Sequence, residues 1–167
     1  MGKSELYYFF LAGFPETVTL TLLAFALARL EFKAAPVFSV ASALNVTTFL
    51  VRRLQIFFGI RIVLLTFFLA LAIYTFQRNH PARIITASSL AMAVLTLLNT
   101  LTICLFNWAW PEYFAAAGQN SMLWLLSSYP YIAVTALLAF LLNAHNKKKT
   151  GAAGPRTILN RGKNYFE

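Results

Sequence analysis

Long apolar runs, separated by short breaks that hold charged residues or proline, constrain this sequence more than any other feature. The runs cover about residues 6–30, 36–51, 57–76, 84–108 and 122–143. A helix needs roughly 20 apolar residues to cross the hydrocarbon core of a bilayer. Only 11% of the chain is charged, against about 25% in soluble domains. Membrane-spanning strands alternate polar and apolar residues, whereas these runs are continuously apolar. The sequence therefore predicts an all-α integral membrane protein, a bundle of about five transmembrane helices with short loops.

Positive charge gathers after the last apolar run. Lys147, Lys148 and Lys149 open a stretch rich in Lys, Gly, Arg and Asn, which has too little apolar surface to offset the entropy of ordering. We therefore expect a transmembrane helical domain over residues 1–146 and a flexible, basic cytoplasmic tail over residues 147–167. A Lys run beside a membrane is typical of contact with anionic lipid headgroups. We expect membrane lipids, and not nucleic acid, to bind there.

The distribution of Lys and Arg among the loops predicts the orientation. With the C-terminus in the cytoplasm, ten of these residues lie on the cytoplasmic side and four on the opposite side. Cytoplasmic loops carry an excess of Lys and Arg, so we expect a multi-pass protein of the cell membrane with its N-terminus outside and its C-terminus inside. The outer four include Arg52, Arg53 and Arg61, an unusual cluster for that side.

Glu16, preceded by Pro15, interrupts the first apolar run. An ionisable residue in a membrane segment is by default a functional hypothesis. In a continuous helix, Glu16 would lie roughly 15 Å deep and would have to be neutral or paired. If the helix begins at Pro15 instead, Glu16 falls in the first turn, where the helix dipole favours a carboxylate. A kink with a hydrogen-bonded Glu16 is the simpler interpretation, and a site for a proton or cation is the alternative.

Arg52, Arg53 and Arg61 bracket a short connection between two runs. An Arg near the end of a span can extend to the lipid headgroups, so membrane anchoring is the simplest role. The sharper hypothesis is an anion-binding rim for phospholipid headgroups, for a peptide carboxylate or for Glu16 itself. An ion pair of Glu16 with Arg53 or Arg61 would satisfy the requirement that buried charges be paired.

Small and hydroxyl residues recur at helical spacing in three of the runs. Helices in lipid associate through close packing, so we expect these ridges to be contact faces, within the chain or with a partner. The ridges are Gly13, Thr17, Thr21, Ala24 and Ala28, then Ala35, Ser39, Ala43 and Thr47, and finally Thr86, Ser89, Ala93, Thr96 and Thr100. The candidates for hydrogen bonds between helices are Thr17, Asn45, Asn99 and Asn107.

Enzyme chemistry has little support in the sequence. The chain has no HExxH motif, no phosphate-binding loop and no Asp for a magnesium-dependent phosphotransfer site. His80 and Cys104 would have to meet from a loop and from the middle of a span. We expect no enzyme activity, no metal and no cofactor. A lipid- or peptide-processing enzyme that uses His80 is a third hypothesis.

Two short segments carry a family resemblance. They are LYYFFLAGFPE at residues 6–16 and RLQIFFGIR at residues 53–61. They resemble small membrane proteins and membrane sensor segments of Firmicutes that are associated with Agr-like histidine kinases. The resemblance covers about the first third of the chain and implies a signalling or accessory module with no catalytic residues. A sensor role would require a kinase on a separate chain.

Two functions follow from these expectations. The leading hypothesis is a non-enzymatic membrane module, a sensory, accessory or assembly subunit that acts through helix–helix contacts with partner membrane proteins or with its own copies. The alternative is a small transporter or channel component. Its polar path would lie around Glu16 and the rim formed by Arg52, Arg53 and Arg61.

Overall fold

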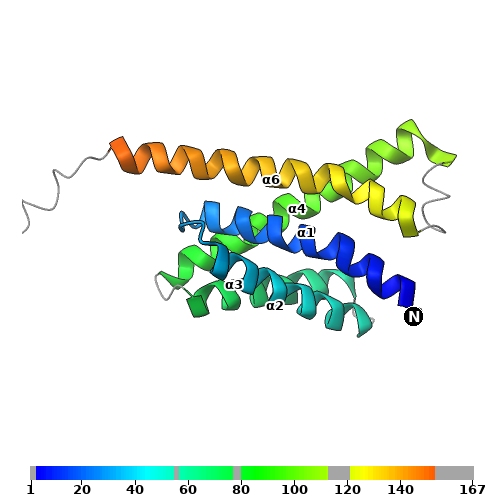
Figure 1. Cartoon of the computed structure of the whole chain (residues 1–167), viewed down its shortest axis with the longest axis horizontal. Helices are drawn as coiled ribbons and strands as arrows, with labels where there is room; N and C mark the ends of the chain where they lie inside the picture. Colours follow the sequence, from blue (N-terminus) through cyan, green and yellow to red (C-terminus); the bar gives the residue numbers. More distant parts are fainter. Residues whose placement is uncertain (1–2, 55–56, 77–79, 113–120, 153–167) are drawn as a thin grey trace, which may run out of the picture.

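The computed structural model is an all-helical bundle and describes residues 3–54, 57–76, 80–112 and 121–152. The helices, labelled as in Figure 1, are α1 (Lys3–Leu27), α2 (Ala34–Arg53), α3 (Phe58–Phe76), α4 (Pro81–Ala109) and α6 (Ser121–Ala152). Consecutive helices run in opposite directions, so α1, α3 and α6 run one way and α2 and α4 the other (Figure 1). This arrangement gives the bundle two ends, the α1–α2 end and the α2–α3 end, each named after the connection that it holds.

Four of these helices are long and apolar enough to cross a membrane within the described residues. The qualifying stretches are Ala34–Val51, Gly59–Phe76, Pro81–Ala109 and Ser127–Lys148. In α1 the apolar stretch Gly13–Leu27 is shorter, so the expected fifth span stays a prediction. Large apolar side chains cover the outside of the bundle, and Trp108 is 85% exposed. A surface of this kind requires an apolar surrounding, which fits a membrane protein.

The helices differ from their predicted bounds mainly at their ends. The first helix begins at Lys3 and ends at Leu27, whereas the apolar run continues to residue 30. Arg29 adopts a left-handed conformation with φ of 53°. The N–H groups of Arg29 and Leu30 donate to the carbonyls of Ala26 and Phe25 at 3.0 and 2.9 Å, the pattern that closes a helix C-terminus. Backbone geometry, and not a loss of apolar residues, therefore ends α1.

The last helix extends beyond the expected domain boundary. It continues to Ala152 with Pro130 inside it, so Lys147, Lys148 and Lys149 lie on a helix and not in an irregular tail. The rest of the expected tail, residues 153–167, lies outside the described residues. The Asn146 side-chain amide donates to the Ala26 carbonyl at 2.8 Å. This hydrogen bond joins the end of α6 to the end of α1.

Helix α1 is the centre of the bundle, because it packs against α2, α4 and α6. Its whole predicted ridge is buried: Gly13, Thr17, Thr21, Ala24 and Ala28. Small side chains let three neighbours approach the α1 backbone closely, which confirms that this ridge is a contact face.

The ridges of α2 and α4 lie mostly on the outside. Exposed residues include Ala35, Ser39, Ala43, Thr86, Ser89, Ala93 and Thr100. The buried faces combine larger residues, among them Val37, Val40, Leu44, Ile84 and Leu95, with other small residues such as Ala41 and Ala91. The larger residues of these faces fill the space beside the small residues of the α1 ridge. Contact within the chain is therefore excluded for most of these two ridges.

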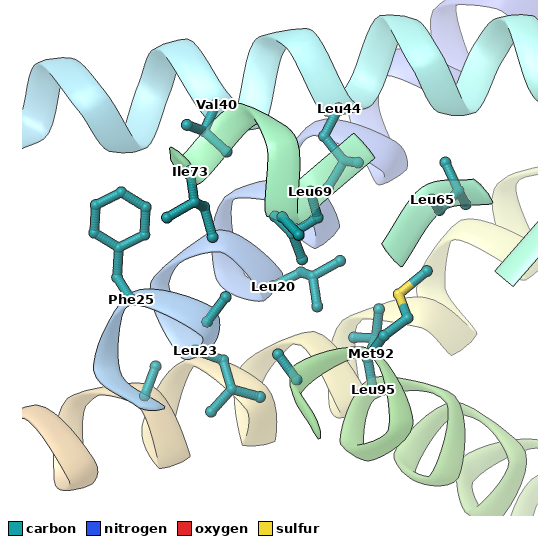
Figure 2. Close-up of a cluster of buried hydrophobic side chains, with 14 of the residues drawn as sticks. Leu20, Leu23, Phe25, Val40, Leu44, Leu65, Leu69, Ile73, Met92 and Leu95 are labelled. Atoms are coloured by element: carbon teal, nitrogen blue, oxygen red, sulfur yellow. The ribbon is translucent and has the colours of Figure 1, made fainter. Parts of the chain in front are cut away.

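The apolar core is densest toward the α1–α2 end. Phe25, Val40, Leu69, Ile73 and Ile84 are almost completely buried there. Figure 2 shows this cluster continuing toward Leu44, Leu65 and Met92, which come from three different helices. The core therefore reaches from the α1–α2 end to the middle of the bundle.

Candidate functional site

A cavity of about 140 Å³ lies between α1, α2, α3 and α4. Its polar wall contains Glu16, Thr17, Thr48, Arg61, Thr96 and Asn99. Its apolar wall contains Leu20, Leu44, Ile62, Leu65, Met92 and Leu95. The cavity therefore combines one carboxylate, one guanidinium and neutral polar groups with an aliphatic surface.

The polar and apolar walls follow from the direction of each helix. On α1, Glu16 lies nearer the α2–α3 end than Leu20, and on α3 Arg61 lies nearer that end than Leu65. The same order holds on the two antiparallel helices, where Thr48 follows Leu44 and Asn99 follows Met92. Four helices thus form a polar layer above an apolar floor. We call these two layers the polar layer and the floor.

The floor continues directly into the packed core. Leu20, Leu44, Leu65 and Met92 line the cavity and also belong to the buried cluster of Figure 2. Phe25, Leu69 and Ile73 lie beyond them, toward the α1–α2 end, and are fully buried. The cavity is therefore closed by tightly packed side chains on the α1–α2 side.

Arg61 contributes the most unusual group in the polar layer. Arg61 lies in the first turn of α3 and is half-buried as a whole residue. Its Nε atom is buried without a hydrogen-bond partner among the described residues. A buried donor that lacks a partner costs roughly 1–3 kcal/mol, and more when it is charged. Such an atom indicates a position where an acceptor is needed.

Three threonines in the polar layer donate within their own helices and can only accept further hydrogen bonds. The hydroxyls of Thr17, Thr48 and Thr96 donate to the carbonyls of Phe14, Leu44 and Met92 of their own helices, at 3.0, 2.8 and 2.9 Å. Because each hydroxyl has one proton, its oxygen keeps only lone pairs for any other contact. The threonine oxygens are therefore acceptors, like the Glu16 carboxylate, and any further hydrogen bond that they make needs a donor from another group.

Glu16 occupies the first of the two geometries weighed from the sequence. Helix α1 is continuous, with Pro15 inside it, so Glu16 lies about 16 Å from the end of α1 by helix rise and does not begin a helix. Its side chain is half-buried on the cavity wall with Arg61. The ion pair of Glu16 with Arg53 or Arg61 stays a prediction.

The remaining site candidates are dispersed. Arg52 and Arg53 are the last two residues of α2, and their side chains lie outside the described part of the structure. Thr17 and Asn99 line the cavity, whereas Asn107 is exposed near the end of α4. Asn45 is buried on α2, and its Oδ1 atom has no hydrogen-bond partner among the described residues.

The basic and histidine candidates lie at the α1–α2 end. Lys147 and Lys148 are exposed on the last turns of α6, and the side chain of Lys149 lies outside the described residues.

His80 is exposed just before α4, and its backbone has a left-handed conformation with φ of 51°. Cys104 is about 35 Å further along this continuous helix and is also exposed. The two side chains do not meet, and among the described residues no His, Cys and Glu group could hold a metal.

Sequence reasoning missed Thr48 and the whole floor of the cavity. Thr48 directly follows Thr47 of the predicted α2 ridge, yet it lies on the cavity wall while most of that ridge faces outward. A helical ridge predicts a face but not its rotation about the helix axis. Only the packing of α2 against α1 and α3 decides which neighbour faces inward.

Comparisons with protein-family models, with curated proteins and with solved structures find no match for this chain. The site must therefore be interpreted from its own chemistry.

Proposed function

We propose that this chain is a non-enzymatic, multi-pass protein of the cell membrane that binds a small polar solute in the cavity between α1, α2, α3 and α4. One observation carries the proposal: Glu16 and Arg61 line the same cavity between apolar helices. Ionisable residues in such helices are expensive and mark ligand or ion sites. Two opposite charges at one cavity support recognition of a polar molecule better than lipid anchoring does.

Binding is better supported than conduction. A polar path across the bundle would need polar residues along its whole length. Beyond the floor lie Phe25, Leu69 and Ile73, which are fully buried and apolar. The polar layer therefore ends inside the bundle, as in a binding pocket with one mouth. A transporter would have to separate these core residues in order to release its solute on the other side.

The positive charges at the α1–α2 end support an orientation for this pocket. Arg29, Lys33, Arg83, Lys147 and Lys148 are all exposed toward the α1–α2 end. The positive-inside rule assigns this end to the cytoplasm, and Lys147 and Lys148 then lie where anionic headgroups would bind them. The N-terminus is then outside and the C-terminus inside. The pocket takes its solute from the outer side, as expected for a sensory or accessory subunit.

Cysteine labelling tests whether the pocket is reached from water. Cys104 is the single cysteine, so Cys104→Ser gives a background without thiols. In proteoliposomes we expect Thr96→Cys and Thr48→Cys in this background to react with the charged reagent 2-aminoethyl methanethiosulfonate, as measured by intact mass spectrometry. Thiols react as thiolates, which form readily in a wet pocket and poorly in lipid.

The matched control is Thr66→Cys on α3. Thr66 is also half-buried, and its hydroxyl also donates to its own helix, to the Ile62 carbonyl at 2.8 Å, but it does not line the cavity. We expect its labelling to be at least about tenfold slower, because a thiol in apolar surroundings has a raised pKa. Equal rates at positions 66 and 96 would refute a water-accessible pocket.

A second function, contact with partner membrane proteins, is favoured by the outward ridges of α2 and α4. Ser39, Ala43, Ser89 and Ala93 are small and exposed on helices that are otherwise covered by large apolar residues. Small residues let another helix approach closely in lipid. We propose these ridges as the docking faces for a partner subunit or a second copy.

Crosslinking tests this second function. With Cys104→Ser as background, Ser39→Cys should form a crosslinked complex in native membranes when a short bis-maleimide is added. Val63→Cys on α3 is the control, because Val63 is 68% exposed and belongs to no ridge. Equal crosslinking of both variants, or of neither, would contradict a specific docking face.

A further inference from the structure

The polar layer of the cavity contains both donors and acceptors of hydrogen bonds. The donors are the guanidinium of Arg61 and the side-chain NH2 group of Asn99, two residues that line the cavity. The acceptors are the Glu16 carboxylate and the oxygens of Thr17, Thr48 and Thr96, whose protons are already donated within their own helices. A molecule that fills this layer needs both an acceptor and a donor of its own. Resting on the binding function proposed above, we propose that the solute is a small zwitterion with a carboxylate and an ammonium group, such as an aliphatic amino acid.

Charge balance favours a zwitterion over a simple anion or cation. An anion beside Arg61 would also lie in the same small cavity as the Glu16 carboxylate, and like charges there would repel strongly. A cation beside Glu16 would meet the Arg61 guanidinium in the same way. A zwitterion adds no net charge, and it brings its carboxylate to Arg61 and its ammonium to Glu16. Glu16 can accept these protons in addition to any contact that it already makes, because a carboxylate has about four lone-pair positions.

The size and the floor of the cavity restrict the class of zwitterion. The cavity is about 140 Å³, close to the roughly 150 Å³ of an engineered cavity that holds benzene. Benzene and alanine both contain six heavy atoms, so a small amino acid fits this space. The aliphatic side chains of Leu20, Leu44, Leu65 and Met92 form the floor. They suit a short apolar side chain that points toward the α1–α2 end.

Protection from labelling tests this inference with three matched probes. The protein is the Cys104→Ser, Thr96→Cys variant in proteoliposomes, and the reagent is 2-aminoethyl methanethiosulfonate. The probes are L-alanine, isobutyrate, in which a methyl group replaces the ammonium, and alaninamide, in which a neutral amide replaces the carboxylate. We expect L-alanine to slow the labelling. The two analogues should need concentrations at least roughly tenfold higher, because each lacks one of the two charged groups with which the zwitterion contacts the site.

Each other outcome has one meaning. Equal protection by isobutyrate would overturn the zwitterion in favour of an anion, and equal protection by alaninamide would overturn it in favour of a cation. Labelling that none of the probes slows would refute the zwitterion and leave the water-accessible pocket standing. Absence of labelling at position 96 would refute the proposed function itself.

Variants of Arg61 separate recognition from folding. Arg61→Gln should abolish protection by L-alanine while labelling continues, and Arg61→Lys should restore part of it because the positive charge returns. Arg83→Gln, which removes an exposed charge at the α1–α2 end, should leave protection unchanged. Gel filtration and thermal unfolding of each variant report its folding. Protection that survives Arg61→Gln in a folded protein would overturn the proposed contact.

Discussion

The two halves of the bundle use the same helices for opposite purposes. Toward the α1–α2 end, Phe25, Leu69 and Ile73 are fully buried in a dense apolar core. Toward the α2–α3 end, α1 and α3 contribute Glu16 and Arg61 to a cavity. Apolar side chains pack densely and leave few voids. Burying a carboxylate or a guanidinium without water or a partner costs free energy. The difference teaches that apolar side chains pack one half of these helices densely, whereas polar side chains leave a cavity in the other half.

Removing the largest fully buried side chain of the described residues should show the strongest contrast. We expect Phe25→Ala to lower the free energy of unfolding by about 3 kcal/mol, because Phe25 is fully buried and its loss leaves a void in a packed region. Unfolding by sodium dodecyl sulfate in mixed micelles measures this. Phe67→Ala is the control, since Phe67 is 61% exposed. An equal effect of the two variants would break the distinction between core and surface.

Adding the same side chain to both halves tests the contrast directly. Ala24→Leu should lower the free energy of unfolding by about 1–3 kcal/mol, because the fully buried Ala24 has no room for it. Thr96→Leu should change it by only about 0.5 kcal/mol, as substitutions outside packed regions do, because Thr96 lines the cavity. The same unfolding assay compares them. A cost at Thr96 equal to that at Ala24 would mean that the cavity is not open space.

The hydrogen bond between α6 and α1 should make a smaller contribution to the packed half. Asn146→Ala removes the donor to the Ala26 carbonyl and should lower stability by about 1 kcal/mol. Hydrogen exchange should become faster in the last turn of α1 in particular. Asn143→Ala, one turn earlier on α6, is the matched control. Unchanged exchange at Ala26 to Leu30 would show that this contact does not hold the two ends together.

The smallest expected effect is on a buried serine, where a substitution should raise the free energy of unfolding and not lower it. The Ser88 hydroxyl is fully buried without a hydrogen-bond partner among the described residues. Ser88→Ala should leave stability unchanged or raise it by up to about 1 kcal/mol, because a desolvated polar group is removed. Thr135→Val should instead lower stability, since the Thr135 hydroxyl donates to the Tyr131 carbonyl at 2.7 Å. A loss of stability in Ser88→Ala would reveal a polar contact in the packed half.

The apolar runs predicted the helices well because each helix is mainly a consequence of local composition. The five runs correspond to α1, α2, α3, α4 and α6, and the differences lie at the ends. The end of α1 escaped prediction because Arg29, which is not a glycine, adopts the left-handed conformation. The extension of α6 to Ala152 escaped it because Lys is a good helix former despite its charge.

The candidate site was predicted in part. Glu16, Thr17, Arg61 and Asn99 were chosen from the sequence, and all of them line one cavity. Ionisable and amide groups stand out in an apolar sequence because their burial is costly. Asn45 and Asn107 were chosen by the same reasoning, but Asn45 is buried without lining the cavity and Asn107 is exposed. Composition does not tell which neighbour, if any, a side of a helix faces.

The sequence by itself determined the class of this protein and the places where its apolar pattern is interrupted. Both are local properties, since each run reports its own preference for helix and for an apolar surrounding. Only the tertiary structure decided that α1 is central, that the ridges of α2 and α4 face outward and that Glu16 and Arg61 share a cavity. These features depend on the rotation and depth of each helix relative to its neighbours. Packing between side chains far apart in the sequence determines both.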